Sequence, residues 1–160
     1  VQGNVLNDDD VSRAVQGQDA VIVVLGSGAK GGLRAPGTAN IITAMKRHGV
    51  SRLICQSTLG AGDSHAVLNF WWKRVMFGLL LRSALADHNA QERLVRESGL
   101  DWTIVRPAAF TDGPKSGRYK AGFGTDARGL TLKISRADVA DFLLRQVGAA
   151  TKGQTLGLSY

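Results

Sequence analysis

The sequence has 160 residues, 44% of them hydrophobic, so the chain can bury a substantial core and one domain is expected. Its formal net charge of +7 comes from dispersed basic residues without a long basic run, so we expect no binding of nucleic acid, while a phosphate-bearing cofactor or an acidic small substrate would suit it. The single Cys55 excludes an intrachain disulfide and is expected to be a buried, inert thiol, and the scattered histidines lack the spacing of a metal site.

Short apolar strands alternate with amphipathic helices along the chain. In the first part, the expected elements are a strand over 2–6, a helix over 8–15, a strand over 20–25, a helix over 38–48 and a strand over 52–56. In the last part, they are a helix over 85–97, a strand over 102–105, a helix over 136–147 and a closing strand over 154–160. Continuous apolar strands between amphipathic helices indicate the α/β class, with a parallel sheet that helices cover on both faces.

Residues 66–81 are harder to interpret, because they are apolar on more than one face. Three interpretations stay open: a helix buried against the sheet, a lid over an apolar substrate pocket, or an interface patch for a partner or a membrane surface. The run over 70–81 contains Lys73 and Arg74 and is too short for a membrane span. Since no cleavable signal sequence is recognised either, we expect a cytoplasmic protein.

The most informative stretch is GLDWTIVRP, residues 99–107. Gly99 is suited to the left-handed cap of the preceding helix, and residues 102–105 are β-branched and aromatic enough for a buried parallel strand. Pro107 removes a backbone donor where that strand would otherwise continue. Because ligands of open α/β sheets bind beyond the carboxyl ends of the strands, the loop gives four candidate site residues: Pro107, Ala108, Ala109 and Phe110.

Two polar side chains are candidates for chemistry. Ser57 follows the strand over 52–56, where its hydroxyl could donate to a carbonyl group of a ligand, or simply belong to a turn. His88, in the first turn of the helix over 85–97, could handle a proton or face solvent. Glu92 lies one turn later and could orient His88 or pair with a cation.

Residues 98–107, SGLDWTIVRP, followed by TDGP at 111–114, resemble the atypical short-chain dehydrogenases/reductases, the NAD(P)H-binding group of the NmrA-like regulators and the biliverdin-IXβ and flavin reductases. Further segments similar to this family are 3–6, 17–26 and 134–140. The resemblance implies one Rossmann-type NAD(P)-binding domain over 1–160. The family opens with a strand, a Gly-rich turn and a helix, and nothing similar precedes Val1, so the resemblance implies a domain that lacks this N-terminal portion.

The resemblance also implies a cofactor site. Residues matching Leu25, Gly26 and Ser27 border the adenosine half of the cofactor in the family, and Ser57 and His88 match a family serine and histidine near the substrate. Asn4 stands where the family usually has Asp, and its amide oxygen can still accept from the adenine amino group. The expected cofactor contacts are Asn4, Val5, Leu6, Leu25, Gly26, Ser27, Gln56, Ser57, Pro107, Ala108, Ala109 and Phe110.

The Tyr-x-x-x-Lys pair that short-chain dehydrogenases generally use is missing, since no tyrosine lies between Ser57 and Arg106. The resemblance therefore implies an NADP- or NAD-dependent oxidoreductase that passes a hydride directly to a small-molecule acceptor needing little help from an acid, such as a flavin, a quinone or a conjugated carbonyl. A non-catalytic, NmrA-like NAD(P) sensor is the alternative, and a relative of nucleotide-sugar epimerases is a weaker one. We expect a monomer or a weak homodimer.

Overall fold

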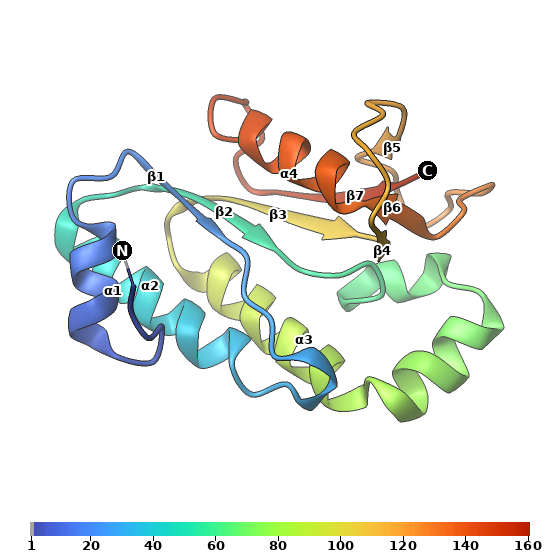
Figure 1. Ribbon diagram of the computed structural model, residues 1–160, viewed down its shortest axis with the longest axis horizontal. Helices are drawn as coiled ribbons and strands as arrows, with labels where there is room; N and C mark the ends of the chain where they lie inside the picture. The colour runs from blue at the N-terminus through green and yellow to red at the C-terminus, as the bar shows by residue number, and fades with distance from the viewer. Residues whose placement is uncertain (1) are drawn as a thin grey trace.

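The computed structural model describes residues 2–160, which form an α/β fold around a five-stranded sheet (Figure 1). The strand order is β1-β2-β3-β7-β5, with β1 (Ala20–Val23), β2 (Arg52–Gln56), β3 (Asp101–Pro107) and β7 (Gln154–Ser159) parallel, and β5 (Lys120–Ala121) antiparallel at one edge. A second sheet pairs β4 (Ala109–Thr111) with β6 (Lys133–Ser135). The expectation of a Rossmann-type, mostly parallel sheet is confirmed.

Helices cover both faces of this sheet (Figure 1). The α-helices are α1 (Asp8–Val15), α2 (Arg34–His48) and α3 (Arg82–Glu97) on one face and α4 (Arg136–Arg145) on the other. Shorter elements are the 3-10 turns η1 (Gly28–Lys30) and η2 (Gly62–Val67) and the π-helix η3 (Trp72–Leu80).

Alternate residues of β2 face two apolar cores. Leu53 and Cys55 pack with side chains of α1, α2 and α3, while Ile54 packs with Val105 of β3 and Val139 of α4 on the other face. Because both faces of β2 are buried, its sequence is a nearly continuous apolar run. Burial raises the pKa of the Cys55 thiol well above its ordinary value, and the expectation of a buried, inert thiol is confirmed.

Residues 2–4 are irregular and residues 5 and 6 form a turn, so the expectation of a strand over 2–6 is wrong. The Asn4 N–H donates to the Asp10 carboxylate at 2.8 Å, and the Leu6 N–H donates to the Asn4 side-chain oxygen at 3.0 Å. The N–H groups of Asn4 and Leu6 therefore bond to side chains instead of to a neighbouring strand. Asn7 then caps α1, since its side-chain oxygen accepts from the Asp10 N–H.

The helix α2 begins at Arg34, four residues before the expected start at 38. The carboxylate of Asp87, on α3, accepts from the backbone N–H groups of Leu33, Arg34 and Ala35 at 3.0 to 3.2 Å. This cap comes from a residue more than 50 positions away, so no local pattern announces it.

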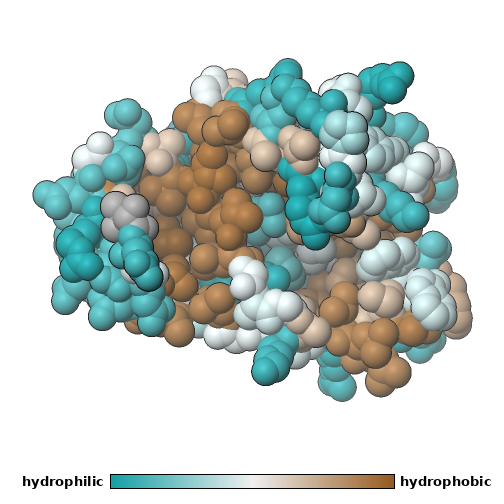
Figure 2. All heavy atoms as spheres, in the orientation of Figure 1, coloured by the Kyte–Doolittle hydropathy of each residue, from teal (hydrophilic) through white to brown (hydrophobic). Residues whose placement is uncertain are grey.

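The apolar segment over 66–81 is divided between two environments. Its π-helix buries Phe77, whereas Phe70 and Leu79 are 76% and 75% exposed. The segment projects from the body of the fold in Figure 1, and Figure 2 shows apolar side chains gathered over it. The interpretation as a helix buried against the sheet and its neighbours therefore holds for the side of Phe77 and is wrong for the side of Phe70 and Leu79. Within residues 2–160, no helix is long and apolar enough to cross a membrane.

Candidate functional site

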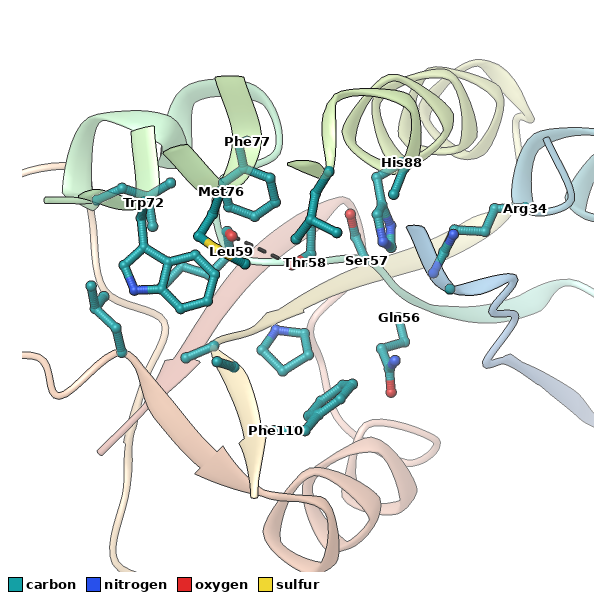
Figure 3. Close-up of a pocket in the computed structure, with 18 residues that line it drawn as sticks. Arg34, Gln56, Ser57, Thr58, Leu59, Trp72, Met76, Phe77, His88 and Phe110 are labelled. Atoms are coloured by element: carbon teal, nitrogen blue, oxygen red, sulfur yellow. Dashed lines mark hydrogen bonds between the residues drawn. The ribbon is translucent and has the colours of Figure 1, made fainter. Parts of the chain in front are cut away.

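A cavity of about 270 Å³ lies where β2 and β3 end (Figure 3). Residues 56–59 and 107–110, which begin with the last residue of each strand, form one part of its wall, and the inner side of η3 forms another. Polar side chains gather at one end of the cavity and apolar side chains at the other (Figure 3). The polar end is formed by Arg34, Gln56, Ser57 and His88. The apolar end is formed by Trp72, Met76 and Phe77. The cavity therefore occupies the sheet edge at which α/β proteins bind ligands.

The structure brings together the predicted site residues that follow the two strands, with the helix histidine beside them: Gln56, Ser57, His88, Pro107, Ala108, Ala109 and Phe110. The predicted adenosine-side residues lie elsewhere. Asn4 and Val5 line a separate groove beside the edge strand β1, and Leu6 is exposed. Leu25, Gly26 and Ser27 lie between β1 and η1. The cofactor contacts of both groups stay predictions.

Ser57 presents an unused hydroxyl at the end of β2. The residue is 2% exposed, and its N–H donates to the Val105 carbonyl at 2.7 Å, which fixes its backbone in the sheet. Its Oγ has no hydrogen-bond partner of regular geometry among residues 2–160, although it lies near enough to the Glu92 carboxylate to help lower the pKa of that group. A buried hydroxyl without a partner is available to a ligand.

His88 is buried, so the solvent-facing interpretation is wrong. The residue is 8% exposed, and its Nδ1 has no partner among the described residues. Burial first, and then the charge of Arg34, lower the pKa of His88 to about 4, while Asp87 and Glu92 act in the opposite direction. The imidazole is therefore neutral at neutral pH, where it offers one donor and one acceptor.

Arg34 is a cavity residue that the sequence analysis missed, because that analysis placed it in a loop before α2. It is 9% exposed, and its Nε and Nη1 have no hydrogen-bond partner among residues 2–160. Asp87 Oδ2 lies 3.8 Å from Nη1, beyond hydrogen-bond distance. The sequence analysis indicated the apolar end of the cavity through one of its three open interpretations of residues 66–81, a lid over an apolar substrate pocket.

Glu92 orients an arginine and not His88. Arg106 donates from Nε and Nη2 to the two Glu92 oxygens at 2.8 Å each, and Arg96 Nη1 donates to Glu92 at 2.9 Å. Burial opposes ionisation, but the hydrogen bonds and charge of Arg106 outweigh it and hold the pKa of Glu92 below its ordinary value. Arg106 also bonds to Asp63 in η2, so this cluster ties β3, α3 and η2 together beside the cavity.

Neither tyrosine lies at the cavity. Tyr119 packs edge-on against Phe142, and the Tyr160 hydroxyl donates to Asp138 at 2.6 Å. No group of three His, Cys, Asp or Glu side chains in the described chain could hold a metal ion. The polar side chains at the cavity are thus the hydroxyls of Ser57 and Thr58, the amide of Gln56, the neutral imidazole of His88 and the guanidinium of Arg34.

This fold and the position of this cavity define a nucleotide-binding protein of the Rossmann type. A family model described as NAD(P)H-binding matches residues 1–150, and the chain belongs to this family. Its cofactor class is thus NAD(P)H, in agreement with the sequence analysis.

Two relatives are similar in sequence. One is the Saccharomyces cerevisiae protein YMR090W, which is 26% identical over 86% of this chain and 60% of the relative. Another is the Bacillus subtilis protein named uncharacterized sugar epimerase YhfK, 29% identical over 82% of this chain and 58% of the relative. The chain thus spans about 60% of the length of these relatives.

Solved structures confirm the fold. A short-chain dehydrogenase/reductase of Veillonella parvula, in complex with NADP, has a TM-score of 0.81 at 21% identity over 100% of this chain and 71% of that chain. ChuY, an anaerobilin reductase of Escherichia coli O157:H7, has a TM-score of 0.77 at 24% identity over 98% of this chain and 72% of that chain. The resemblance to atypical short-chain dehydrogenases/reductases is confirmed at the level of the fold and of the NAD(P)H-binding family.

Proposed function

We propose that residues 1–160 act as one NAD(P)-binding domain of a reductase that passes a hydride from NADPH or NADH directly to an acceptor. The observation that carries this proposal is the cavity at the ends of β2 and β3, which combines apolar walls with the unpartnered hydroxyl of Ser57 and the neutral imidazole of His88. Two structurally similar proteins support the proposal, since ChuY is an anaerobilin reductase and the Veillonella parvula protein binds NADP.

Each polar group has a separate task in this proposal. When bound, the nicotinamide supplies the hydride. Ser57 donates a hydrogen bond to the carboxamide of the nicotinamide or to an acceptor carbonyl, and His88 donates or accepts one on the acceptor side. The loop over 107–110 and the inner side of η3 exclude water from the space between them.

The acceptor is a flat, conjugated molecule that needs little help from an acid: a flavin, a quinone or a conjugated carbonyl. The support for this choice is the absence of both tyrosines from the cavity and the apolar end formed by Trp72, Met76 and Phe77. Such walls suit an aromatic body better than a sugar, which disfavours the epimerase alternative.

The test is NADPH consumption by the 160-residue chain at millimolar cofactor, with menadione, FMN and a conjugated enone as acceptors. We expect turnover with at least one acceptor, and we expect it to fall in Ser57→Ala. The matched control is Ser116→Ala, because Ser116 is a serine outside the cavity. Cofactor binding without consumption of NADPH across all three acceptors would contradict the reductase and favour a sensor.

A further inference from the structure

The outer side of η3, together with the two residues before it, presents large apolar side chains to solvent. Phe70, Trp71, Leu79 and Leu80 are each more than half exposed, and we call these four residues the outer patch. Figure 2 shows apolar side chains gathered over this segment. Single exposed apolar residues are common on proteins, but a gathered set of them marks contact with another molecule.

Basic residues without acidic partners accompany the outer patch. Lys73 and Arg74 lie within η3, and Arg82 is the first residue of α3, close behind it in the chain. None of the three forms an ion pair among residues 2–160. The sequence over 64–86 contains no Asp or Glu that could neutralise them. This surface is therefore both apolar and positively charged.

The turn η1 adds a fourth basic residue beside the start of α3. The Ser83 hydroxyl donates to the Lys30 carbonyl at 2.6 Å, which holds η1 against this end of the helix. Lys30 is exposed, and in the described part of the chain it too has no ion pair. We call the four basic residues the basic rim: Lys30, Lys73, Arg74 and Arg82.

This combination favours an anionic lipid surface over a second copy of the chain. Aromatic and aliphatic side chains next to Lys and Arg are typical of helices that lie in the plane of a bilayer interface. The apolar groups enter the boundary of the acyl chains, the indole stays at the level of the headgroups, and the cations attract anionic lipids. A second copy bound by two-fold symmetry would place the same basic residues opposite each other, with no carboxylate of this segment between them.

We propose that the outer patch and the basic rim dock the protein on the surface of a membrane that contains anionic lipids. The segment η3 then lies at the headgroups, with its outer side toward the lipid, while Phe77 stays packed in the protein core. The net charge of +7 adds a long-range attraction to such a surface. This docking is separate from the proposed reaction and requires no turnover.

The test is co-sedimentation of the 160-residue chain with two kinds of vesicle at low salt. One is made of phosphatidylcholine alone, and the other of equal parts of phosphatidylcholine and phosphatidylglycerol. We expect at least about tenfold tighter binding to the anionic vesicles, because each cation near such a surface contributes to the attraction. This binding should weaken as the salt concentration rises. Equal binding to both vesicles, or no binding to either at millimolar lipid, would overturn the proposal.

Variants with matched controls locate the docking surface. Leu79→Ser should weaken binding to the anionic vesicles by about tenfold, because a buried leucine contributes roughly that much. Its control is Leu144→Ser, which changes a 64% exposed leucine of α4 on the opposite face of the sheet. Arg74→Gln should weaken binding by about fivefold, and its control is Arg93→Gln, at an exposed arginine farther along α3. Equal losses in a variant and its control would contradict this surface.

Two further measurements separate docking from unfolding and from self-association. The denaturation midpoints of Leu79→Ser and Arg74→Gln should match that of the native chain, because both side chains are exposed. Sedimentation equilibrium should show a native chain whose association state Leu79→Ser does not change. A dimer that Leu79→Ser dissociates would assign the outer patch to a second copy and overturn the proposal.

Discussion

Asp87 accepts a hydrogen bond from the backbone of Arg34 and forms a longer ion pair with its side chain. The Asp87 carboxylate accepts the Arg34 N–H at 3.0 Å, while the same carboxylate lies 3.8 Å from the Arg34 guanidinium. One acidic residue of α3 thus caps the start of α2 and also supplies the carboxylate that balances the charge of the buried Arg34 guanidinium. His88, the residue after Asp87 in α3, lines the cavity at the ends of β2 and β3 together with Arg34.

The first prediction concerns this cap. Asp87→Asn keeps the shape but removes the charge, and we expect it to lower the free energy of unfolding at pH 7 by about 1 to 2 kcal/mol. Burial opposes ionisation, but the backbone hydrogen bonds from α2 outweigh it and hold the pKa of Asp87 below 3.8. A lowered pKa stabilises the fold above the ordinary Asp range, and this stabilisation is lost as the pH falls through the folded-state pKa.

Urea denaturation of both proteins at several pH values checks this. The advantage of the native chain over Asp87→Asn should be full at pH 7 and should shrink below pH 4. An advantage that is constant down to pH 2 would show that the carboxylate charge plays no part in the cap.

The second prediction concerns His88. Its pKa is lowered to about 4 by burial and by Arg34, against Asp87 and Glu92, whereas an unfolded chain protonates its histidines near pH 6.5. The unfolded state therefore binds more protons between these values, so stability is lost as the pH falls from about 6.5 to about 4. His88→Gln should lose that part of the pH dependence.

NMR titration of the His88 ring measures the pKa directly, with His65 as an internal comparison outside the cavity. A His88 pKa of 6 or higher would contradict the neutral imidazole. The proposed reaction should also show no rate change from His88 titration between pH 5 and 8.

The third prediction concerns Ser57. Ser57→Ala should lower turnover by roughly ten- to a hundredfold, as the loss of one positioned donor does. Because the hydroxyl has no regular partner in the structure, its removal should leave the denaturation midpoint nearly unchanged. Unchanged kinetics would reduce Ser57 to a turn residue, and a large loss of stability would show that its hydroxyl is bonded within the protein.

The fourth prediction separates the two sides of η3. Phe77 packs in the core with Leu59 and Leu68, so Phe77→Ala should cost about 3 to 5 kcal/mol of stability. Leu79→Ala, on the exposed side, should change stability by less than about 0.5 kcal/mol. Similar losses for both variants, measured by chemical denaturation, would contradict the orientation of this helix.

The parts of the fold that sequence reasoning predicted depend on local patterns. β2 has the predicted bounds, 52–56, because apolar runs and a glycine stop define it. α4 begins at the predicted residue, 136, because the hydroxyl of Ser135 accepts from the Asp138 N–H three residues later and caps the helix. The strand predicted over 102–105 extends over 101–107 in the structure and ends at Pro107, which has no N–H to donate.

The parts that could not be predicted depend on contacts between distant residues. Arg34 and His88 line the same cavity because Asp87 of α3 caps the start of α2. Nothing near Arg34 in the sequence indicates that a helix begins there. The prediction of a strand over 2–6 was wrong because the side chains of Asp10 and Asn4 accept hydrogen bonds from the N–H groups of Asn4 and Leu6. The low pKa of His88 follows from burial, which a sequence pattern does not reveal.

The central claim is that a hydride passes directly between cofactor and acceptor in the cavity where β2 and β3 end. The most direct measurement uses NADPH that carries deuterium at C4 of the nicotinamide, with mass spectrometry of the reduced acceptor at a carbon that does not exchange with water. The account predicts that deuterium appears in the product, at a rate lowered in Ser57→Ala. A product formed without deuterium from either C4 position, or no product from any acceptor, would contradict it.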